Sequence, residues 1–462
     1  MLEVDKKNIP HGDSFGLNPD LVHFLCEAID QKDITRIKDH VASMHSADLA
    51  DFINQSSPEQ REILLEVIRN HLDPAVLIDL EGEVKPEVME QLGAKKSAEA
   101  LAQLDPDDAV QVIEDLQKDD QQEILEAISD SNQRSELEQS LAYPEDSAGR
   151  LMEQNFVAIP GDWNVGQTID FLRNEEHELP SDFYQIFVVD EHNRPTGAVL
   201  VSRVLRNKRD VEILDIMQED LRLINVNTDQ EEVAYMFRKY ALASSPVVDD
   251  TGKMVGVISV DDIVDVMDEE AEEDILHLGG IMQSDLFSSF FKTTGKRFPW
   301  LFINLFTALA GATVISMFEA TIEKLVALAV MMPIIASLAG NAGTQALTIA
   351  VRGLATKELT ATNARRILLK EIFVGLSNGL LFATIVGTVS YLYYGNLNLS
   401  LVFASAVIGT LLVAGLAGTV IPLILSRMKI DPAIASGVFL TTMTDALAFF
   451  IFLGLATWWL IN

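Results

Sequence analysis

Five apolar stretches in the C-terminal part of the chain constrain its fold more than any other feature of the sequence. Each is at least 21 residues long, and a helix rising 1.5 Å per residue needs about 20 residues to cross a hydrocarbon core about 30 Å thick. We therefore expect residues 297–462 to form an all-α transmembrane domain of five helices. The stretches are Phe298–Phe318, Leu325–Val351, Ile372–Tyr394, Leu401–Leu425 and Ala433–Leu460.

The basic residues between these stretches predict how the domain is oriented. Residues 286–462 contain 11 Lys+Arg, of which only Lys324 falls on one side of the predicted membrane. The positive-inside rule places the other ten in the cytoplasm. We expect a multi-pass protein of the cytoplasmic membrane, with its N-terminus in the cytoplasm and its C-terminus outside.

The remainder of the chain is strongly acidic. Residues 1–285 carry a net charge of −40, against +5 for residues 286–462. Such a charge repels nucleic acid and attracts cations, so metal ions are the expected partners. Cys26 is the only cysteine, and the eight scattered histidines form no HExxH-like pair. We find no nucleophile–base pair, no catalytic residues and no cleavable signal peptide, and we do not expect an enzyme.

The fifth stretch carries an acidic residue, Asp445, near its middle. An ionised carboxylate at membrane depth costs about 3 kcal/mol on insertion scales, so it normally faces water, a partner or an ion. Thr441, Thr442 and Thr444 add oxygen atoms to the same turns of helix. We favour an ion pathway here, and the alternative is a protonated Asp that serves helix packing.

The second stretch is interrupted by polar and small residues. Gly340, Asn341, Thr344 and Gln345 lie inside an otherwise apolar helix. Amide oxygens can contact a partly hydrated ion, whereas small residues also permit close helix packing. Both interpretations remain open for this stretch, while the fourth stretch, also rich in small residues, is expected to pack rather than conduct.

Apolar positions at helical spacing predict an acidic helical domain over residues 20–141, after an N-terminal tail of residues 1–19. A weak repeat relates ADLADFI and the helix after it to DDAVQVI and the helix after it, which favours stacked helix pairs. Asp107 and Asp108 open one of these helices. They either serve the helix N-terminus or face a metal ion.

A segment of short β-rich runs then occurs twice, in residues 142–206 and residues 207–266. The first copy contains FVVDEHNRPTGAVLV and the second contains PVVDDTGKMVGVISV. Both follow the same strand–turn–glycine–strand pattern, and a helix comes next. This tandem repeat resembles a CBS domain pair, an α/β module. The resemblance implies a pseudo-symmetric disc that often dimerises, and it makes ATP a possible ligand of the pair.

An acidic connector, residues 267–296, joins the second copy to the membrane domain. Carboxylates crowd its first half, and like charges four residues apart destabilise a helix. Mg²⁺ prefers such oxygen ligands and would relieve the repulsion. We interpret the connector as cation-responsive, against the alternative of a passive acidic linker.

In order and content, these parts resemble the MgtE-type magnesium channels and transporters. The matching motifs are EDSAGRLM, EEAEEDILHLGG, GNAGTQ and DPAIASGVFLTTMTDALAFFIFLGLA, and the resemblance spans nearly the whole chain. It implies a homodimer in the lipid bilayer with a pore on its two-fold axis. By resemblance, Asp445 of each subunit holds hydrated Mg²⁺ near Asn341, and the connector is a plug helix.

The resemblance also implies that cytosolic Mg²⁺ closes the pore by binding between the helical, CBS and plug parts. Its regulatory ligands would be Asp229, Glu231, Asp262, Asp265, Glu273 and Asp274, with Asp107 and Asp108 on the facing helical surface. Ala241 stands where the resemblance implies an aspartate, so we expect at least one regulatory ligand of the family to be absent here.

The alternatives in function are a CBS-based nucleotide or ionic-strength sensor with a membrane anchor, and a broader divalent transporter that also admits Co²⁺. The sequence does not distinguish channel conduction from coupled transport.

Overall fold

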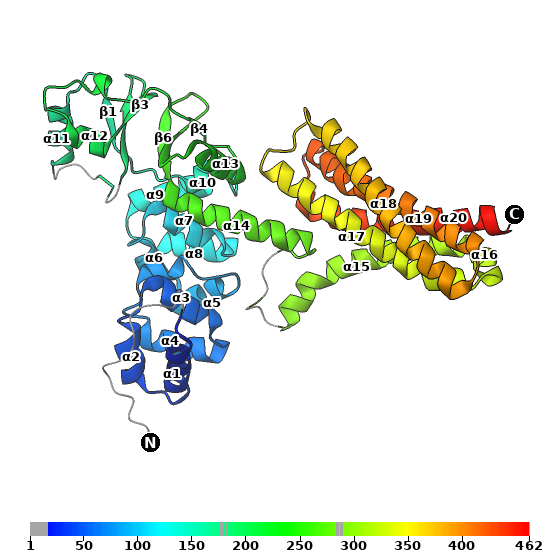
Figure 1. Ribbon diagram of the computed structural model, residues 1–462. Helices are drawn as coiled ribbons and strands as arrows, with labels where there is room; N and C mark the ends of the chain where they lie inside the picture. Colours follow the sequence, from blue (N-terminus) through cyan, green and yellow to red (C-terminus); the bar gives the residue numbers. More distant parts are fainter. Residues whose placement is uncertain (1–16, 175–178, 181–182, 283–285, 287–289, 462) are drawn as a thin grey trace. The chain divides into compact units, whose positions relative to one another are not determined.

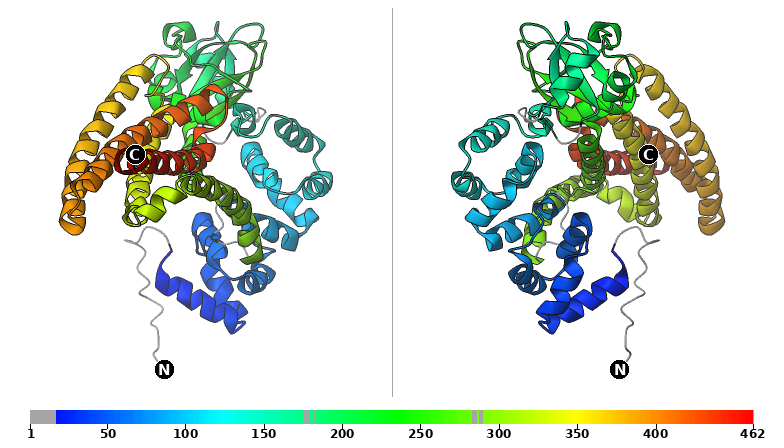
Figure 2. Two further views of the ribbon diagram at one scale, coloured as in Figure 1. Left: turned by 90° about the vertical axis from the view of Figure 1, so that its right-hand side faces the viewer. Right: turned by 90° about the vertical axis from the view of Figure 1, so that its left-hand side faces the viewer.

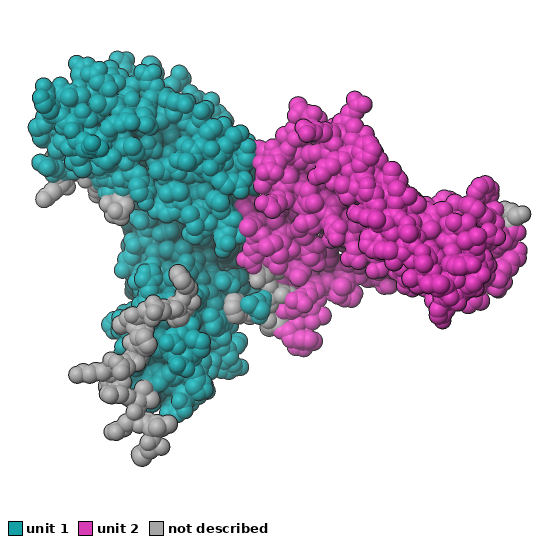
Figure 3. All heavy atoms as spheres, viewed as in Figure 1, with its two compact units in different colours: residues 1–269, 285–288 teal, residues 270–284, 289–462 magenta. Residues whose placement is uncertain are grey.

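The computed structural model describes residues 17–174, 179–180, 183–282, 286 and 290–461. Most of the predicted tail, residues 1–16, and residues 283–285 and 287–289 of the connector lie outside this description. The chain divides into two compact units, residues 1–269 with 285–288, and residues 270–284 with 289–462 (Figure 3). We describe each unit separately.

The first unit begins with an all-α domain whose helices start where the sequence supplies capping residues. Asn18 caps the first helix, and Ser57 with Gln60 forms a capping box at the fourth. Phe52, Leu25 and Ile113 are fully buried in a core shared by these helices. The helices are α1 (Pro19–Asp30), α2 (Ile34–Val41), α3 (Ser46–Gln55), α4 (Pro58–Ile68), η1 (Pro74–Leu77), α5 (Val84–Leu92), α6 (Ala94–Leu101), α7 (Pro106–Glu114), α8 (Lys118–Ala127) and α9 (Ser131–Leu141).

The weak sequence repeat corresponds to two helix pairs, α3–α4 and α7–α8 (Figure 1). In each pair the first helix buries the apolar face that the repeat preserves, including Phe52 and Ile53 in α3 and Val112 and Ile113 in α7. The predicted helical domain is therefore confirmed as a series of short packed helices.

Two three-stranded sheets with the same topology follow. In each, the first strand pairs parallel to the second, and the second pairs antiparallel to the third. A register shift falls at the equivalent position, Val188/Val189 in one sheet and Val247/Val248 in the other. This repetition confirms the CBS pair. The elements are α10 (Ala148–Leu151), β1 (Ala158–Pro160), α11 (Val165–Leu172), β2 (Gln185–Val189), β3 (Pro195–Leu200), α12 (Val201–Arg206), η2 (Ile213–Asp215), β4 (Ile224–Asn225), α13 (Gln230–Tyr240), β5 (Ser244–Val248), β6 (Met254–Ser259) and α14 (Val260–Leu278).

The segment that precedes each sheet in sequence packs into the core of the other sheet. Ala148 and Met152 precede the first sheet in sequence, yet they lie in the core around β4, β5 and β6. Ile213 and Met217 precede the second sheet but pack around β1, β2 and β3. The two copies thus share their cores, and a division at 206/207 in sequence does not divide the packing.

Helix α14 continues without interruption from the second repeat into the connector. The predicted boundary at 266/267 therefore lies inside one helix. The helix ends at Leu278, and Gly280 then adopts a φ of +74°. A Cβ on Gly280 would collide with the Trp300 indole, so glycine is required there for both conformation and space.

The second unit contains, among its described residues, five helices long and apolar enough to cross a membrane. Helix α19 is the most enclosed, and Figures 1 and 2 show it alongside α17 and α18. Glycines of α18 approach its backbone, and a Cβ at Gly379 would lie 3.0 Å from the Cα of Ile408. The fourth predicted span therefore packs, as expected. The helices are α15 (Phe290–Ser316), α16 (Glu319–Lys324), α17 (Ala327–Ala355), α18 (Ala364–Tyr394), α19 (Leu397–Arg427), α20 (Pro432–Ala456) and a π-helical turn, η3 (Thr457–Ile461).

Candidate ion sites

Helices α17 and α20 pack closely at the level of the predicted ion pathway. A Cβ at Gly343 would lie 3.1 Å from the Leu440 side chain and 3.2 Å from that of Thr444. The absence of a side chain at Gly343 therefore allows the two helices to touch. Asp445 directly follows Thr444 on α20, so the carboxylate lies at the level of this crossing.

A polar stripe follows one face of α17. It comprises Ser337, Asn341, Thr344, Gln345 and Thr348, all of which are exposed in the single chain and spaced by three, four or one residues. The Asn341 amide nitrogen donates to the Ser337 carbonyl oxygen at 2.9 Å, so its own carbonyl oxygen can accept from water. Gly340, between the stripe and the packed face, is half-buried.

Asp445 is half-buried on α20, whereas Thr444 beside it is buried. The hydroxyls of Thr441 and Thr442 donate to the carbonyl oxygens of Gly437 and Val438, at 2.9 Å and 2.7 Å. Each hydroxyl oxygen still has a lone pair for a further donor or an ion's water. The predicted pore residues thus lie on two helices that pack together, α17 and α20, and their role in conduction remains a prediction.

The first unit gathers three carboxylates from three different parts of the sequence. Oxygen atoms of Asp107, Glu153 and Asp262 all lie within 4.8 Å of one another. Asp107 is in the first turn of α7, Glu153 is held by backbone hydrogen bonds to Val257 of β6, and Asp262 opens α14. We call this group the acidic triad. Sequence reasoning named Asp107 and Asp262 but missed Glu153, because a single acid after AGRLM gives no local signal.

The triad is electrostatically strained in the absence of a cation. Burial, and then the charge of Asp262, raises the pKa of Asp107 to about 8, and Asp107 Oδ1 is buried without a hydrogen-bond partner among the described residues. Burial likewise raises the pKa of Glu153 to about 7 and that of Asp262 to about 6. Burial and the charge of Asp105 raise the pKa of neighbouring Asp108 to about 6. Converging, desolvated carboxylates of this kind suit a hard dication.

The other predicted regulatory residues lie elsewhere. Asp229 accepts a hydrogen bond from the Glu231 amide at 3.0 Å and so caps α13, and both side chains are exposed. Asp265 is exposed one turn beyond Asp262. Among the described residues the structure does not place these three within the triad. Their role as ligands stays a prediction.

Glu273 and Asp274 lie on the part of α14 that belongs to the second unit. The Glu273 carboxylate is 3.4 Å from Nε2 of His277, one turn later. Burial, and then the charge of Asp431, raises the pKa of Asp274. These acids are therefore grouped with His277 and Asp431, two residues that the sequence did not assign to a regulatory site.

Comparison with known proteins matches three parts of the chain to known families. Residues 332–455 match MgtE, described as a divalent cation transporter, residues 44–146 match the MgtE intracellular N domain, and residues 213–269 match the CBS domain. The magnesium transporter MgtE of Enterococcus faecalis is 34% identical over 322 residues, covering 70% of this chain and 71% of the relative. The chain belongs to the MgtE family. The magnesium transporter MgtE of Bacillus subtilis is 33% identical over 316 residues, covering 68% and 70%.

A solved structure of the cytosolic domain of the Mg²⁺ channel MgtE in complex with ATP is also similar. It is 29% identical, and the match covers 53% of this chain and 99% of that one, with a TM-score of 0.48.

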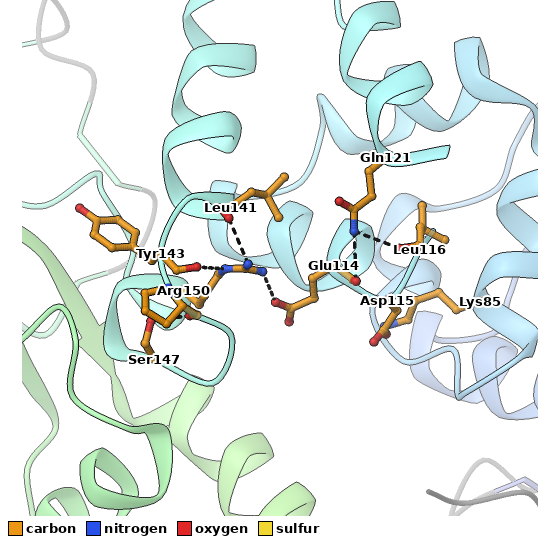
Figure 4. Close-up of polar contacts among 10 residues, drawn as sticks. Lys85, Glu114, Asp115, Leu116, Gln121, Leu141, Tyr143, Ser147 and Arg150 are labelled. Atoms are coloured by element: carbon orange, nitrogen blue, oxygen red, sulfur yellow. Dashed lines mark hydrogen bonds and ion pairs between the residues drawn. The ribbon is translucent and has the colours of Figure 1, made fainter. Parts of the chain in front are cut away.

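The part matched to the MgtE intracellular N domain ends four residues before Arg150, which fastens it to the CBS pair (Figure 4). The Arg150 guanidinium donates to the carbonyl oxygens of Tyr143 and Leu141 and to the Glu114 carboxylate, at 3.0, 3.1 and 2.8 Å. Glu114 is the last residue of α7, and Arg150 lies three residues before Glu153. This clamp thus links the helix that carries Asp107 to the segment that carries Glu153.

Proposed function

We propose that this MgtE family member is a Mg²⁺-selective channel or transporter that imports magnesium across the cytoplasmic membrane as a homodimer. The observation that carries the proposal is the carboxylate of Asp445, deep in a membrane-spanning helix that packs against α17, the helix with the exposed polar stripe. The magnesium transporters among its relatives support the choice of ion.

The polar stripe supports the homodimer. Five polar side chains on a membrane-spanning helix are exposed in the single chain, and hydrocarbon would leave their polar groups poorly solvated. A second copy related by a two-fold axis would cover the stripe and enclose a hydrated path. Each subunit would contribute one Asp445, so two negative charges would meet one divalent ion.

Hydration favours Mg²⁺ as the cargo. Mg²⁺ dehydrates reluctantly and keeps an octahedral shell of water. Carboxylate, amide and hydroxyl oxygens can accept hydrogen bonds from that water, and Asp445, Asn341, Thr344, Gln345, Thr441 and Thr442 supply these groups.

Closure by cytosolic Mg²⁺ follows from the acidic triad. An ion there would neutralise three desolvated carboxylates and join the N domain to the CBS pair, so it would bind the joined arrangement better than a separated one. Only such differential binding can shift the equilibrium, and a shift of about 100-fold requires ~2.7 kcal/mol. Asp108, Asp229, Glu231, Asp265, Glu273 and Asp274 remain proposed contributors. ATP in the CBS pair remains a prediction.

The test of permeation uses full-length protein in liposomes that contain a Mg²⁺-sensitive dye. We expect Asp445→Asn to abolish Mg²⁺ uptake, because the neutral amide removes the charge that compensates the ion. Glu319→Gln, an exposed acid of the same domain, is the matched control and should transport normally. Uptake by Asp445→Asn at the wild-type rate and with the wild-type preference would reject the proposed permeation site.

A further inference from the structure

Two asparagines on membrane-spanning helices lack the internal hydrogen bonds that the threonines of one of these helices make. Asn304 of α15 and Asn378 of α18 are exposed in the single chain, and neither side-chain amide has a hydrogen-bond partner in the described part of the molecule. By contrast, Thr384 and Thr388 of α18 donate to carbonyl oxygens of their own helix, at 2.8 and 2.7 Å. The threonines are thus satisfied in hydrocarbon, whereas the two amides require an outside partner.

The two asparagines lie at the same predicted depth in the membrane. Asn304 is six residues beyond Phe298 and Asn378 is six residues beyond Ile372, where the first and third apolar stretches begin. At 1.5 Å per residue, both amides lie about 9 Å inside the hydrocarbon, where an unpaired amide is costly. The first and third spans cross in the same direction, and a two-fold axis along the membrane normal preserves direction and depth. Asn304 of one copy and Asn378 of another can therefore meet at one level.

The packing within the second unit shows which ends of the bundle are open. Helix α18 packs against α19, α19 packs against α17 and α20, and α15 packs against α20. The spanning helices thus form a row with α18 at one end, at the outer edge of the bundle in Figure 2, and α15 at the other. Two copies that enclose a path lined by α17 and α20 join these rows end to end. That closure brings α15 of one copy to α18 of the other.

The two end surfaces are complementary in size. On α15, Ala308 and Ala312 follow Asn304 at intervals of four residues, and both are exposed. On α18, Phe382 and Ile385 lie on the same face as Asn378 and are 40% and 58% exposed. Small residues on one helix allow large side chains of another to approach closely in a membrane.

We propose that α15 of one subunit packs against α18 of a second copy of this chain, and that Asn304 hydrogen-bonds there to Asn378 of the partner subunit. Each amide carries a donor and an acceptor, so two asparagines can form two reciprocal hydrogen bonds. Two-fold symmetry supplies the pair twice per dimer. The inference rests on the homodimer proposed above and adds a contact outside the ion path.

Cross-linking tests the contact in the full-length protein in its membrane. In a Cys26→Ser background, a chain with Asn304→Cys and one tag is co-expressed with a chain that carries Asn378→Cys and another tag. Mild oxidation should give a covalent dimer that bears both tags, because a disulfide forms only between Cα atoms within about 7 Å. Leu376→Cys in place of Asn378→Cys is the matched control, since it lies at the same depth on another face of α18 and should give no such dimer.

Dimer affinity tests the hydrogen bond itself, by energy transfer between labelled subunits in lipid vesicles. Asn304→Leu and Asn378→Leu should each raise the dissociation constant of the dimer at least about 5-fold, as expected for the loss of an interhelical hydrogen bond. The double variant should be little weaker than either single variant, because both remove the same pair. Thr388→Val, which removes an internally satisfied hydroxyl, should leave the affinity unchanged.

The outcomes separate this contact from the proposed function. Equal cross-linking through Leu376→Cys, or additive effects of the two leucine substitutions, would overturn the pairing. Absence of the doubly tagged dimer from a protein that takes up Mg²⁺ would reject the contact and leave the transport function standing. A doubly tagged dimer of a protein that takes up no Mg²⁺ would reject the function and support the contact.

Discussion

Replacing Asp107 with asparagine should stabilise the metal-free junction between the N domain and the CBS pair. The pKa of Asp107 is raised from 3.8 to about 8, chiefly by burial. At ~1.4 kcal/mol per pH unit, this raised pKa lowers the free energy of unfolding at pH 7 by at most ~4 kcal/mol. The substitution also removes a negative charge from the first turn of α7, and this loss destabilises the helix by ~0.3–1 kcal/mol. The neighbouring acids still repel one another in the variant, which further reduces the gain. We expect a net gain of ~2 kcal/mol, within the range of single substitutions.

The effect should depend on pH in a defined direction. Because the folded-state pKa is raised, the wild-type junction is most stable below the unfolded value of 3.8 and loses this stability as pH rises through about 8. The advantage of Asp107→Asn should therefore be large near pH 8 and shrink toward pH 4. Mg²⁺ binding displaces protons from the triad, so the affinity of the wild-type protein for Mg²⁺ should fall as the pH is lowered from about 8 to about 4.

Hydrogen–deuterium exchange of the full-length protein measures this junction directly. Without Mg²⁺ at pH 7.5, peptides of α7 and of residues 148–153 should exchange about 30-fold more slowly in Asp107→Asn than in wild type, as expected for ~2 kcal/mol. Adding Mg²⁺ should slow exchange in wild type but scarcely in the variant. Asp119→Asn, an exposed acid of α8, is the matched control. Faster exchange in Asp107→Asn, or an equal response to Mg²⁺, would refute the reasoning.

Three further substitutions test the packing of the two units. Ala241 has a φ of +50°, a conformation that costs energy for any residue with a Cβ. Ala241→Gly should therefore stabilise the CBS pair by ~1 kcal/mol in denaturant unfolding, and an unchanged stability would show that this backbone strain is absent. Arg150→Met removes three hydrogen bonds and leaves Glu114 partly buried, and it should weaken the clamp by ~2 kcal/mol, seen as faster exchange in α9 and α10. Gly379→Leu should lower the melting temperature in detergent, because its side chain would meet the backbone of α19, whereas Gly295→Ala, with no heavy atom within 4 Å of its Cβ, should not.

The five membrane helices could be predicted from sequence because length and hydropathy are local properties. Their ends were less predictable. Helix α15 begins at Phe290 and α18 at Ala364, each eight residues before the apolar stretch, because polar and basic residues can continue a helix beyond the hydrocarbon. The CBS repeat was equally visible, since its strand and turn pattern recurs at a fixed spacing.

The ion sites were predictable only in part. Asp445 stands out because a carboxylate is rare in an apolar helix, and Asp107 and Asp262 belong to dense acidic runs. Glu153 and His277 have no such context. Each became a candidate because it lies close to a residue more than a hundred positions away in sequence. Glu153 lies close to Asp262, and His277 lies close to Asp431.

The sequence by itself determined which segments are helices and strands, which of them can enter a membrane, and on which part of the chain the negative charge lies, because these depend on residues close together in the chain. Only the tertiary structure decided that the segment preceding each CBS sheet packs into the core of the other sheet. It also decided which carboxylates come together and which of them lie beside His277. Those outcomes depend on packing between distant segments, which composition and spacing do not specify.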